Sequence, residues 1–297
     1  MSHLTRREWN KLMLGALSGG IAVLARQPES ALAAPKINST FKGVLIGAQS
    51  YSFRDRPLDK ALEAYVAVGL SSAELWQGHL EPRVSRDELR KWRLTTPLSH
   101  FTDIRSKFSQ AGVGIYAYNY SVRGDFTDEE IARGFEIAKA LGARCITASS
   151  QPEVVKRIDV YARKYKMRVG MHNHSNIRPN EFATPDDFAQ AMNGASEYIC
   201  VNLDIGHFTA ANFDAVDYLS KHHDRIVTLH LKDRKRNQGA NVVFGEGDTP
   251  IKPVLELLSK NKWKIPANIE YEYKGGDTID EMKKCLAYCK QALGVMA

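Results

Sequence analysis

A regular alternation of short apolar runs with longer segments of helical periodicity constrains the fold of this chain most strongly. The alternation starts at Val44 and continues almost to the end of the 297 residues. The apolar runs have the length and composition of buried strands, and the segments between them are long enough for helices. The eight expected strands cover residues 44–53, 71–76, 113–120, 144–149, 168–174, 198–204, 226–233 and 267–273.

Helical periodicity follows each of these strands. The eight expected helices lie near residues 57–68, 98–111, 127–141, 152–165, 184–194, 213–222, 250–260 and 277–292. Strands that alternate with helices form a parallel sheet, and eight such units close into a (β/α)8 TIM barrel. An open doubly wound α/β sheet is the alternative, but no Gly-x-Gly-x-x-Gly follows the first strand. We therefore predict a single-domain α/β TIM barrel.

The N-terminal segment has the pattern of an export signal. The pair Arg6-Arg7 precedes an apolar run, residues 12–24, that is too short and too rich in small residues for a comfortable membrane span. Ala31-Leu32-Ala33 supplies a small-x-small cleavage site, and TRREWNK resembles the twin-arginine signal, which exports folded proteins across the bacterial inner membrane. We expect residues 1–33 to be a signal peptide and residues 34–297 to be a periplasmic barrel without stable membrane association. An uncleaved anchor is the alternative.

The charge of the chain gives no support to nucleic-acid binding. The formal net charge is +7, and residues 1–33 contribute +2 of it, from four basic residues against two acidic ones, which leaves +5. The remaining basic residues are scattered among acidic ones, with no basic stripe and no aromatic motif of the RNA-binding type. We therefore expect a small-molecule partner and no nucleic acid.

The four cysteines do not form a recognisable redox or zinc motif. Cys145 and Cys200 lie in apolar strands and are expected to be small core residues. Cys285 and Cys289 are one helical turn apart, on the expected buried side of the last helix. A disulfide between them is the alternative in an oxidising compartment.

Two connections are longer than a barrel requires, residues 78–96 and residues 234–249. Both follow strands and are expected at the C-terminal rim, where long connections usually determine substrate specificity. The second contains FGEGDTP, residues 244–250, which is rich in glycine but lacks the Lys-Ser/Thr of a phosphate-binding loop. We interpret it as a rim turn that presents Glu246. Decorative surface loops are the alternative for both connections.

Polar and ionisable side chains occupy one face of four successive strands near their C-terminal ends. Because the apolar face of each strand must meet the helices, the polar face points to the barrel axis. That face carries His172, His174, Asp204, His230, Lys232, Glu270 and Glu272. Burying so many ionisable groups together is costly without compensation, and a divalent cation compensates most simply.

The donor set favours a transition metal. His172 or His174 with Asp204, His230 and Glu270 combines nitrogen and oxygen ligands suited to Mn²⁺, Co²⁺, Zn²⁺ or Fe²⁺. A hydrogen-bonded core histidine is the alternative at any one strand, but it does not explain four neighbouring strands. We therefore expect one divalent metal ion as cofactor.

The same stretches carry a family resemblance. Over residues 40–292 the chain resembles the xylose isomerase-like TIM barrels, often described as sugar phosphate isomerases/epimerases, in the motifs HNH, VNLDIGH, LHLKD and IEYEY. Members bind one divalent metal through Glu, Asp, His and Glu from strands five to eight, and the last three map onto Asp204, His230 and Glu270. The sequence HNHSN replaces the first Glu, so the resemblance assigns this ligand to His172, with His174 as second choice.

The missing glutamate bears on the reaction. Epimerases of the family use the carboxylates of strands five and eight as bases on opposite faces of the reacting carbon, and a metal-bound His172 does not easily replace the first. Proton abstraction next to a metal-polarised carbonyl, followed by β-elimination or its reverse, needs one base. The inosose dehydratase-like and 3-keto-glycoside lyase-like branches also have histidine-rich strand-five ends. We therefore expect a lyase or hydratase acting on a keto-sugar, with a sugar isomerase or epimerase as the alternative.

Further residues are expected to act on a carbohydrate substrate. The base is His174, Glu272 or His207, and Lys232 stabilises the oxyanion. The Asp-x-x-His pattern of the family also makes His207 a substrate contact beside the metal. Groups at remoter strand ends that are expected to bind sugar hydroxyls or stack on the ring are Glu74, Trp76, His79, Tyr118 and Glu246, with structural roles as the alternative.

Two other function classes remain to be distinguished. An endonuclease IV-like nuclease shares the barrel, but it needs three zinc ions and more ligands than these strand ends offer. A non-catalytic periplasmic sugar-binding protein would bind sugar without metal. The oligomeric state stays open.

Overall fold

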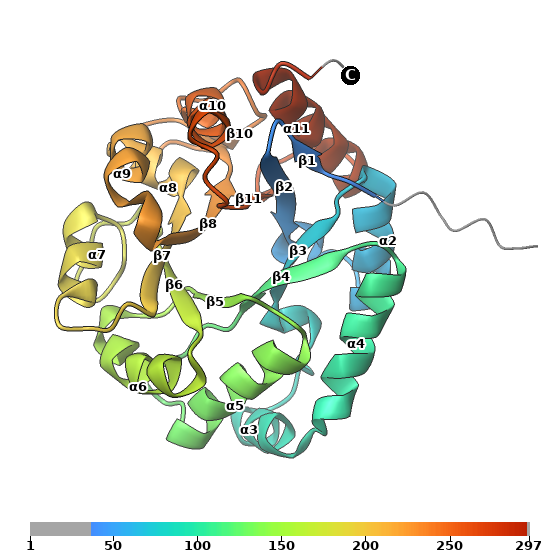
Figure 1. The fold of residues 1–297 in the computed structure, drawn as a ribbon, viewed down its shortest axis with the longest axis vertical. Coiled ribbons are helices and arrows are strands. Elements are labelled where there is room, and N and C mark those ends of the chain that lie inside the picture. Colours follow the sequence, from blue (N-terminus) through green and yellow to red (C-terminus); the bar gives the residue numbers. More distant parts are fainter. Residues whose placement is uncertain (1–36, 296–297) are drawn as a thin grey trace, which may run out of the picture. The chain divides into compact units, whose positions relative to one another are not determined.

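Eight buried apolar runs become parallel strands that close into a barrel (Figure 1). The computed structural model describes residues 37–295, so the expected signal peptide lies outside the described residues. The barrel strands are β2 (Val44–Gln49), β3 (Ser72–Trp76), β4 (Gly114–Asn119), β5 (Cys145–Ala148), β6 (Arg168–His172), β7 (Ile199–Asp204), β8 (Ile226–Leu231) and β11 (Ala267–Ile269). Each pairs in parallel with the next, and β11 pairs with β2 to close the circle. The predicted TIM barrel is confirmed.

A ring of helices covers the barrel, and every predicted helix is present. These are α2 (Leu58–Val68), α4 (Leu98–Gln110), α5 (Asp128–Ala140), α6 (Val155–Tyr165), α7 (Pro185–Met192), α9 (Ala215–His222), α10 (Ile251–Asn261) and α11 (Thr278–Ala292). Local capping fixes several of their starts: Thr127 and Glu130 form a capping box at α5, and Thr184 and Asp187 form one at α7. No helix in the described part of the chain is long and apolar enough to span a membrane.

The structure adds short elements that the periodicity did not predict. They are the edge strand β1 (Thr40–Phe41), the hairpin β9 (Asp233–Arg234) and β10 (Asn241–Val242), the helices α3 (Arg86–Thr95) and α8 (Ile205–Ala210), and the 3₁₀ turns η1 (Ser50–Phe53), η2 (Gln77–His79), η3 (Pro152–Val154) and η4 (His223–Arg225). Helix α3 lies in the connection 78–96, which was interpreted as a rim loop. Its signal was readable, because Ser85 and Glu88 form the capping box that starts it.

The cysteines are buried, as predicted. Cys145 and Cys200 pack with Ala117 and Val227 in a small apolar cluster. Cys285 and Cys289 lie on the inner side of α11 within the main core. All four side chains are free thiols.

Ion pairs anchor α3 to the barrel. Arg93 is 2% exposed and donates to both oxygens of Glu81, at 2.7 and 2.8 Å. It also reaches Glu130 of α5, which is fully buried and receives Arg86 at 2.7 and 2.9 Å and Arg90 at 3.1 Å. Burial opposes the ionisation of Glu130, but hydrogen bonds from these arginines outweigh it and lower its pKa to about 2. The inserted helix is therefore a fixed wall rather than a loose loop.

Replacing Glu130 by Gln is expected to lower the free energy of unfolding at pH 7 by about 3 kcal/mol, because it removes the buried carboxylate that pairs with Arg86, Arg90 and Arg93. The ionised Glu130 stabilises the fold above its ordinary pKa of 4.5, and this contribution is lost as the pH falls towards about 2. The difference between wild type and variant should therefore shrink over that window. Urea denaturation from pH 7 to pH 3 measures it, with the exposed neighbour Glu129→Gln as control. A difference that stays constant with pH contradicts the assignment.

Candidate active site

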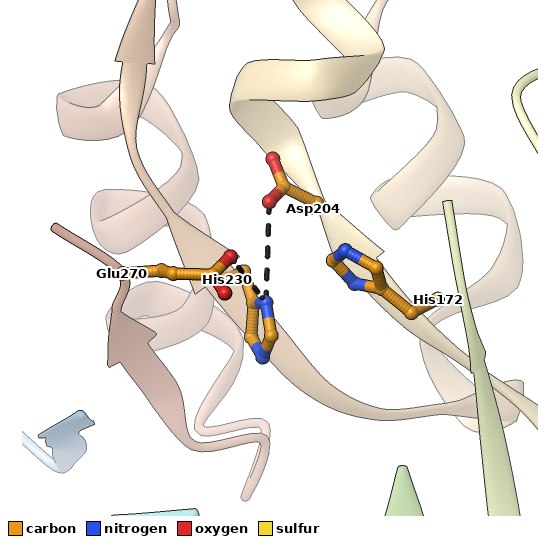
Figure 2. A group of neighbouring side chains, drawn as sticks. All are labelled: His172, Asp204, His230 and Glu270. Atoms are coloured by element: carbon orange, nitrogen blue, oxygen red, sulfur yellow. Dashed lines mark hydrogen bonds and ion pairs between the residues drawn. The ribbon is translucent and has the colours of Figure 1, made fainter. Parts of the chain in front are cut away.

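Four ionisable side chains meet at the C-terminal ends of the barrel strands. His172 ends β6, Asp204 ends β7, His230 lies in β8 and Glu270 directly follows β11. Figure 2 shows the four side chains directed towards one another. Each offers one ligand atom, and these four atoms all lie within 4.8 Å of one another. The cluster is buried, as the alternation of polar and apolar residues along the strands requires.

Asp204 presents one carboxylate oxygen to the cluster. Its Oδ1 accepts a hydrogen bond from the backbone N–H of His207, 2.7 Å away, and thereby caps α8. The side chain of Asn173 pairs with the backbone of Asp204 on both sides, at 2.9 and 3.1 Å, and so holds the ends of β6 and β7 together. Oδ2 is buried and makes no hydrogen bond within residues 37–295. It faces the Lys232 ammonium, 3.1 Å away.

His230 lies between two carboxylates. Its Nδ1 is 2.9 Å from Glu270 Oε2 and 3.9 Å from Asp204 Oδ2, and its Nε2 is 3.0 Å from Glu74 Oε1 (Figure 2 shows the Nδ1 side). A carboxylate accepts hydrogen bonds only, so both ring nitrogens donate here, Nε2 to Glu74 and Nδ1 to Glu270, and Nδ1 would give up its proton to bind a metal ion. Burial opposes charge on this ring, but Glu74 and Glu270 raise the pKa of His230 well above 6.5. Glu74 therefore fixes the ring so that Nδ1 faces the cluster.

Glu74 lies beneath the cluster, inside the barrel, and does not line the cavity. It is fully buried, and both of its oxygens are engaged by donors from four other strands. The donors are Gln49, Thr147 and His230 to Oε1, at 3.0, 2.6 and 3.0 Å, and Asn268 and Thr228 to Oε2, at 2.9 and 3.4 Å. The structure therefore gives Glu74 a positioning role in place of the expected contact with substrate.

The donor set fits a divalent metal. Two imidazoles and two carboxylates within one coordination sphere are the ligands that Zn²⁺, Mn²⁺, Co²⁺ and Fe²⁺ accept. Burial raises the pKa of Asp204 to about 6, against the opposing effect of Lys232. Burial also disfavours the charge on Glu270, but Lys232 and His230 hold its pKa well below 4.5. Asp204 Oδ2 is buried and faces the Lys232 ammonium, 3.1 Å away, while no hydrogen bond within residues 37–295 saturates it, so it can also serve as a metal ligand.

Lys232 is the positive charge next to the cluster. Its ammonium lies 3.1 Å from Asp204 Oδ2, 2.9 Å from Glu270 Oε2 and 2.5 Å from Glu272 Oε2. Burial opposes this charge, but the three carboxylates raise the pKa of Lys232 well above 10.5. Gly206 allows α8 to approach it, because a Cβ at that position would collide with Lys232. Lys232 is therefore a permanent cation at the edge of the cluster.

His207 lies between two cations. Its Nε2 is 3.1 Å from Lys232 Nζ and its Nδ1 is 2.8 Å from Arg234 Nη1. Burial and the Lys232 ammonium hold the pKa of His207 well below 6.5. Taking up a proton would place a third positive charge here, so His207 suits hydrogen bonding better than proton transfer. Arg234 was not identified from the sequence, since the run Arg234-Lys235-Arg236 resembles an ordinary basic surface loop.

His174 also lines the cavity, two residues after His172. Its ring lies 5.2 Å from that of His172 and 5.5 Å from that of His207, both nearly perpendicular to it. Within the described residues its imidazole makes no hydrogen bond. Burial and the Lys232 ammonium lower the pKa of His174 below 6.5, so the ring is neutral at neutral pH. A neutral imidazole with free nitrogens can accept a proton.

A cavity of about 620 Å³ opens over the cluster. It is lined by His172, His174, His207, His230, Lys232, Glu270 and Glu272, all of which the sequence placed in the site, and by Trp76. Asp204 lies fully buried beneath these side chains. The structure thus brings together the residues predicted at the ends of the last four strands, together with one aromatic side chain from β3.

Besides Glu74, three more of the expected substrate contacts lie outside this cavity. Both nitrogens of His79 are engaged, Nδ1 at 2.9 Å from Ser50 Oγ and Nε2 at 3.3 Å from Phe53 O. Tyr118 is 1% exposed and stacks on Tyr120 within the core. Glu246 is exposed on the rim turn and does not line the cavity. These residues therefore have structural or surface positions.

Other cavity residues were missed from the sequence. Arg86, Leu89 and Arg93 of α3 form one wall, and Gln77, Ser121 and Phe126 continue it. The length of the connection 78–96 was the available signal for this wall, but its helix was not recognised. Asn173 joins the ends of β6 and β7, but no role was predicted from the sequence for this residue of the HNH motif.

Comparisons with known proteins agree with this fold. A family model described as xylose isomerase-like TIM barrel matches residues 62–292. Inosose dehydratase of Lactiplantibacillus plantarum is 26% identical over 164 residues, which cover 48% of this chain and 54% of that protein, about half of its length. The IOLI protein, solved with a binding zinc atom, superposes with a TM-score of 0.65 at 14% identity, covering 84% of this chain and 98% of its own. The 3-keto-D-glucoside 4-epimerase YcjR of E. coli has a TM-score of 0.62 at 13% identity, with 84% and 99% covered.

Replacing Asp204 or Glu270 by Ala is expected to abolish metal retention, because each removes a charged ligand from a buried set of four. Metal content after gel filtration, measured by plasma mass spectrometry, tests this. Glu272→Gln is the matched control, since this carboxylate lies at the same strand end outside the four. Full metal content in the Asp204 or Glu270 variant contradicts the site.

Glu74→Gln is expected to weaken metal affinity by about 10- to 100-fold, the usual effect of losing a group that orients a metal-bound histidine. The amide of this variant would place N–H groups against side chains that donate their own hydrogen bonds to the Glu74 carboxylate. Competition with a fluorescent chelator gives the affinity, and the melting temperature shows whether the variant is folded. Unchanged affinity in a folded variant would mean that Glu74 does not orient His230.

Proposed function

The chain belongs to the xylose isomerase-like TIM barrel family, and we propose that it is a divalent-metal-dependent enzyme that removes a proton next to a sugar carbonyl. One observation carries the proposal. The buried four-residue cluster, the neutral imidazole of His174 and the Lys232 ammonium all border one cavity. This combination supplies a cation site, a proton acceptor and a charge for a developing oxyanion.

The residues that would hold the metal are His172, Asp204, His230 and Glu270. A divalent ion there supplies Lewis-acid polarisation of a carbonyl oxygen. The zinc atom in the structurally similar IOLI protein supports a metal in this kind of barrel. Glu74, Asn173 and the N-terminal turn of α8 orient the protein side of this site through hydrogen bonds.

His174 accepts the proton in the proposed reaction. It faces the cavity as a neutral imidazole, whereas Glu272 is paired with Lys232 and His207 lies between two cations. The Lys232 ammonium borders the cavity, and its positive charge stabilises the oxygen on which negative charge develops. Proton removal at one face by one base distinguishes this arrangement from a two-carboxylate epimerase.

We favour a lyase acting on a 3-keto-glycoside. His174 takes the proton from C2, the C–H electron pair forms the C1–C2 double bond, and the C1–O bond breaks. The leaving oxygen departs with its electron pair and takes up a proton, which yields an unsaturated keto-sugar and an alcohol. The curated relative is a dehydratase, which supports an elimination, and a 3-keto-glucoside enzyme shares the fold.

Other function classes have less support. A sugar isomerase or epimerase is the alternative, because enzymes of that kind share the barrel. Among residues 37–295 one cluster of metal-binding type is found, whereas an endonuclease IV-like site needs three zinc ions. The twin-arginine-like segment, residues 1–33, leads us to propose that the enzyme works in the periplasm.

Incubation of metal-loaded protein with methyl 3-keto-glucosides and simple ketoses in D₂O, followed by NMR, tests the proposed function. Release of methanol with an unsaturated sugar supports the lyase. Deuterated stereoisomers without release support the epimerase instead. Sugar binding without deuterium exchange under any metal would contradict an enzyme of this class.

His174→Asn is expected to lower kcat by about 10²- to 10⁴-fold, the usual contribution of a positioned general base, while the metal content stays that of the wild type. His79→Asn is the matched control, because this histidine lies outside the cavity. Steady-state kinetics and metal analysis of both variants measure the difference. A His174 variant with wild-type kcat would exclude it as the base.

A further inference from the structure

The cavity extends well beyond the metal cluster. Its volume of about 620 Å³ lies in the middle of the roughly 300–1,000 Å³ range of pockets that enclose whole small-molecule ligands. One end is formed by the cluster and His174. The other end reaches Leu89 of α3 and Phe126 of the connection between β4 and α5. We call this second end the distal compartment.

The distal compartment has a built wall. Helix α3 is an insertion that the barrel does not require, and it packs beside α5 (Figure 1). The buried ion pairs of Arg93 with Glu81 and Glu130 hold it in place, and the Arg93 guanidinium also lies 4.3 Å from the centre of the Phe126 ring. A helix fixed in this way presents Leu89 to the cavity in one position.

Aromatic and uncharged polar groups line the passage between the two ends. Trp76 and Tyr51 pack edge to face, with ring centres 5.0 Å apart, and both border the cavity. Gln77, Asn119 and Ser121 add amide and hydroxyl groups. Rings that stack on apolar faces, next to amides that bond hydroxyls, suit a carbohydrate ring.

The two α3 arginines of the distal compartment are paired with carboxylates. Arg86 pairs with Asp125 and Glu130, and Arg93 pairs with Glu81 and Glu130. Arg123 is exposed where the cavity opens to solvent. A phosphate would find no free buried cation in this wall among the described residues, so the lining favours a neutral ligand.

We propose that the distal compartment binds the leaving group of the substrate as a second, neutral sugar ring, so that the substrate is a keto-disaccharide. This inference rests on the proposed function, because a glycoside that is cleaved at C1 has a leaving group to accommodate. The cluster then holds the ring that carries the carbonyl, and Leu89, Phe126 and Trp76 border the ring that departs.

Calorimetric titration with sugars that lack the keto group tests the compartment. The probes are trehalose, maltose and cellobiose, compared with methyl α- and β-glucoside, each added to metal-loaded protein. At least one disaccharide is expected to bind 10-fold or more tightly than either methyl glucoside. Methyl glucosides that bind as tightly as every disaccharide overturn the proposal. Tighter binding of glucose 1-phosphate than of any disaccharide overturns it as well.

A bulky side chain at position 89 tests whether the preference for disaccharides arises in the distal compartment. Leu89→Trp is expected to remove the 10-fold preference for the disaccharide without changing the affinity for methyl glucoside. Leu94 lies on the same helix and is 39% exposed, so Leu94→Trp is expected to change neither the preference for the disaccharide nor the affinity for methyl glucoside. Leu89→Phe repeats the test with a smaller ring, and melting temperatures confirm that each variant is folded. A preference that survives in folded Leu89→Trp excludes this compartment.

The two proposals fail in different ways. The binding probes have no carbonyl, so their affinities do not depend on turnover. Disaccharide binding that depends on Leu89, without any reaction of the keto-sugars, contradicts the proposed lyase and supports the compartment. Release of methanol from methyl 3-keto-glucoside, without any preference for disaccharides, supports the lyase and contradicts the compartment.

Discussion

The hydrogen bond between the buried Glu74 carboxylate and His230 is the interaction on which the interior of the barrel depends. A carboxylate without charge or hydrogen bonds would be far too costly at this depth. Here it accepts hydrogen bonds from side chains of β2, β5, β8 and β11, and so ties strands on opposite sides of the barrel together. The same contact sets the proton of His230 on Nε2 and turns Nδ1 towards the cluster. Glu74 therefore contributes both to the stability of the barrel and to the geometry of the site.

The residues of the candidate site differ in how many contacts hold their side chains. Asp204, His230 and Glu270 are fixed by strand ends, a helix cap and buried partners. His174, two residues beyond the end of β6, donates its backbone N–H to the carbonyl of Phe182, but its ring makes no hydrogen bond within the described residues. The three proposed metal ligands are thus held by several contacts each, whereas both ring nitrogens of His174, the proposed base, remain free to bond a ligand. The difference follows from position: the ligands lie within a strand or directly after it, whereas His174 lies two residues beyond the end of β6.

The sequence predicted the barrel well because alternation of strand and helix is a local pattern that leaves few closed arrangements. It also brought Asp204, His230 and Glu270 to one place, since parallel strands end at the same side. It did not predict the positions of Glu74, His79 and Tyr118, because hydrogen-bond partners from distant strands decide whether a polar side chain faces the cavity or the interior. Helix α3 was missed although Ser85 and Glu88 mark its start. The long connection suggested specificity, but its fixed geometry depends on Glu130, forty-odd residues away in the chain.

The attachment of α3 has an evolutionary consequence. The helix contributes one wall of the cavity but no strand, no cluster residue and none of the contacts of Glu74. Its sequence can therefore drift, lengthen or be exchanged while the reactive centre stays intact, provided that an arginine still reaches the acidic pair below. Related barrels with different insertions at this point would then differ in the ligands that the cavity admits while they keep the same buried cluster.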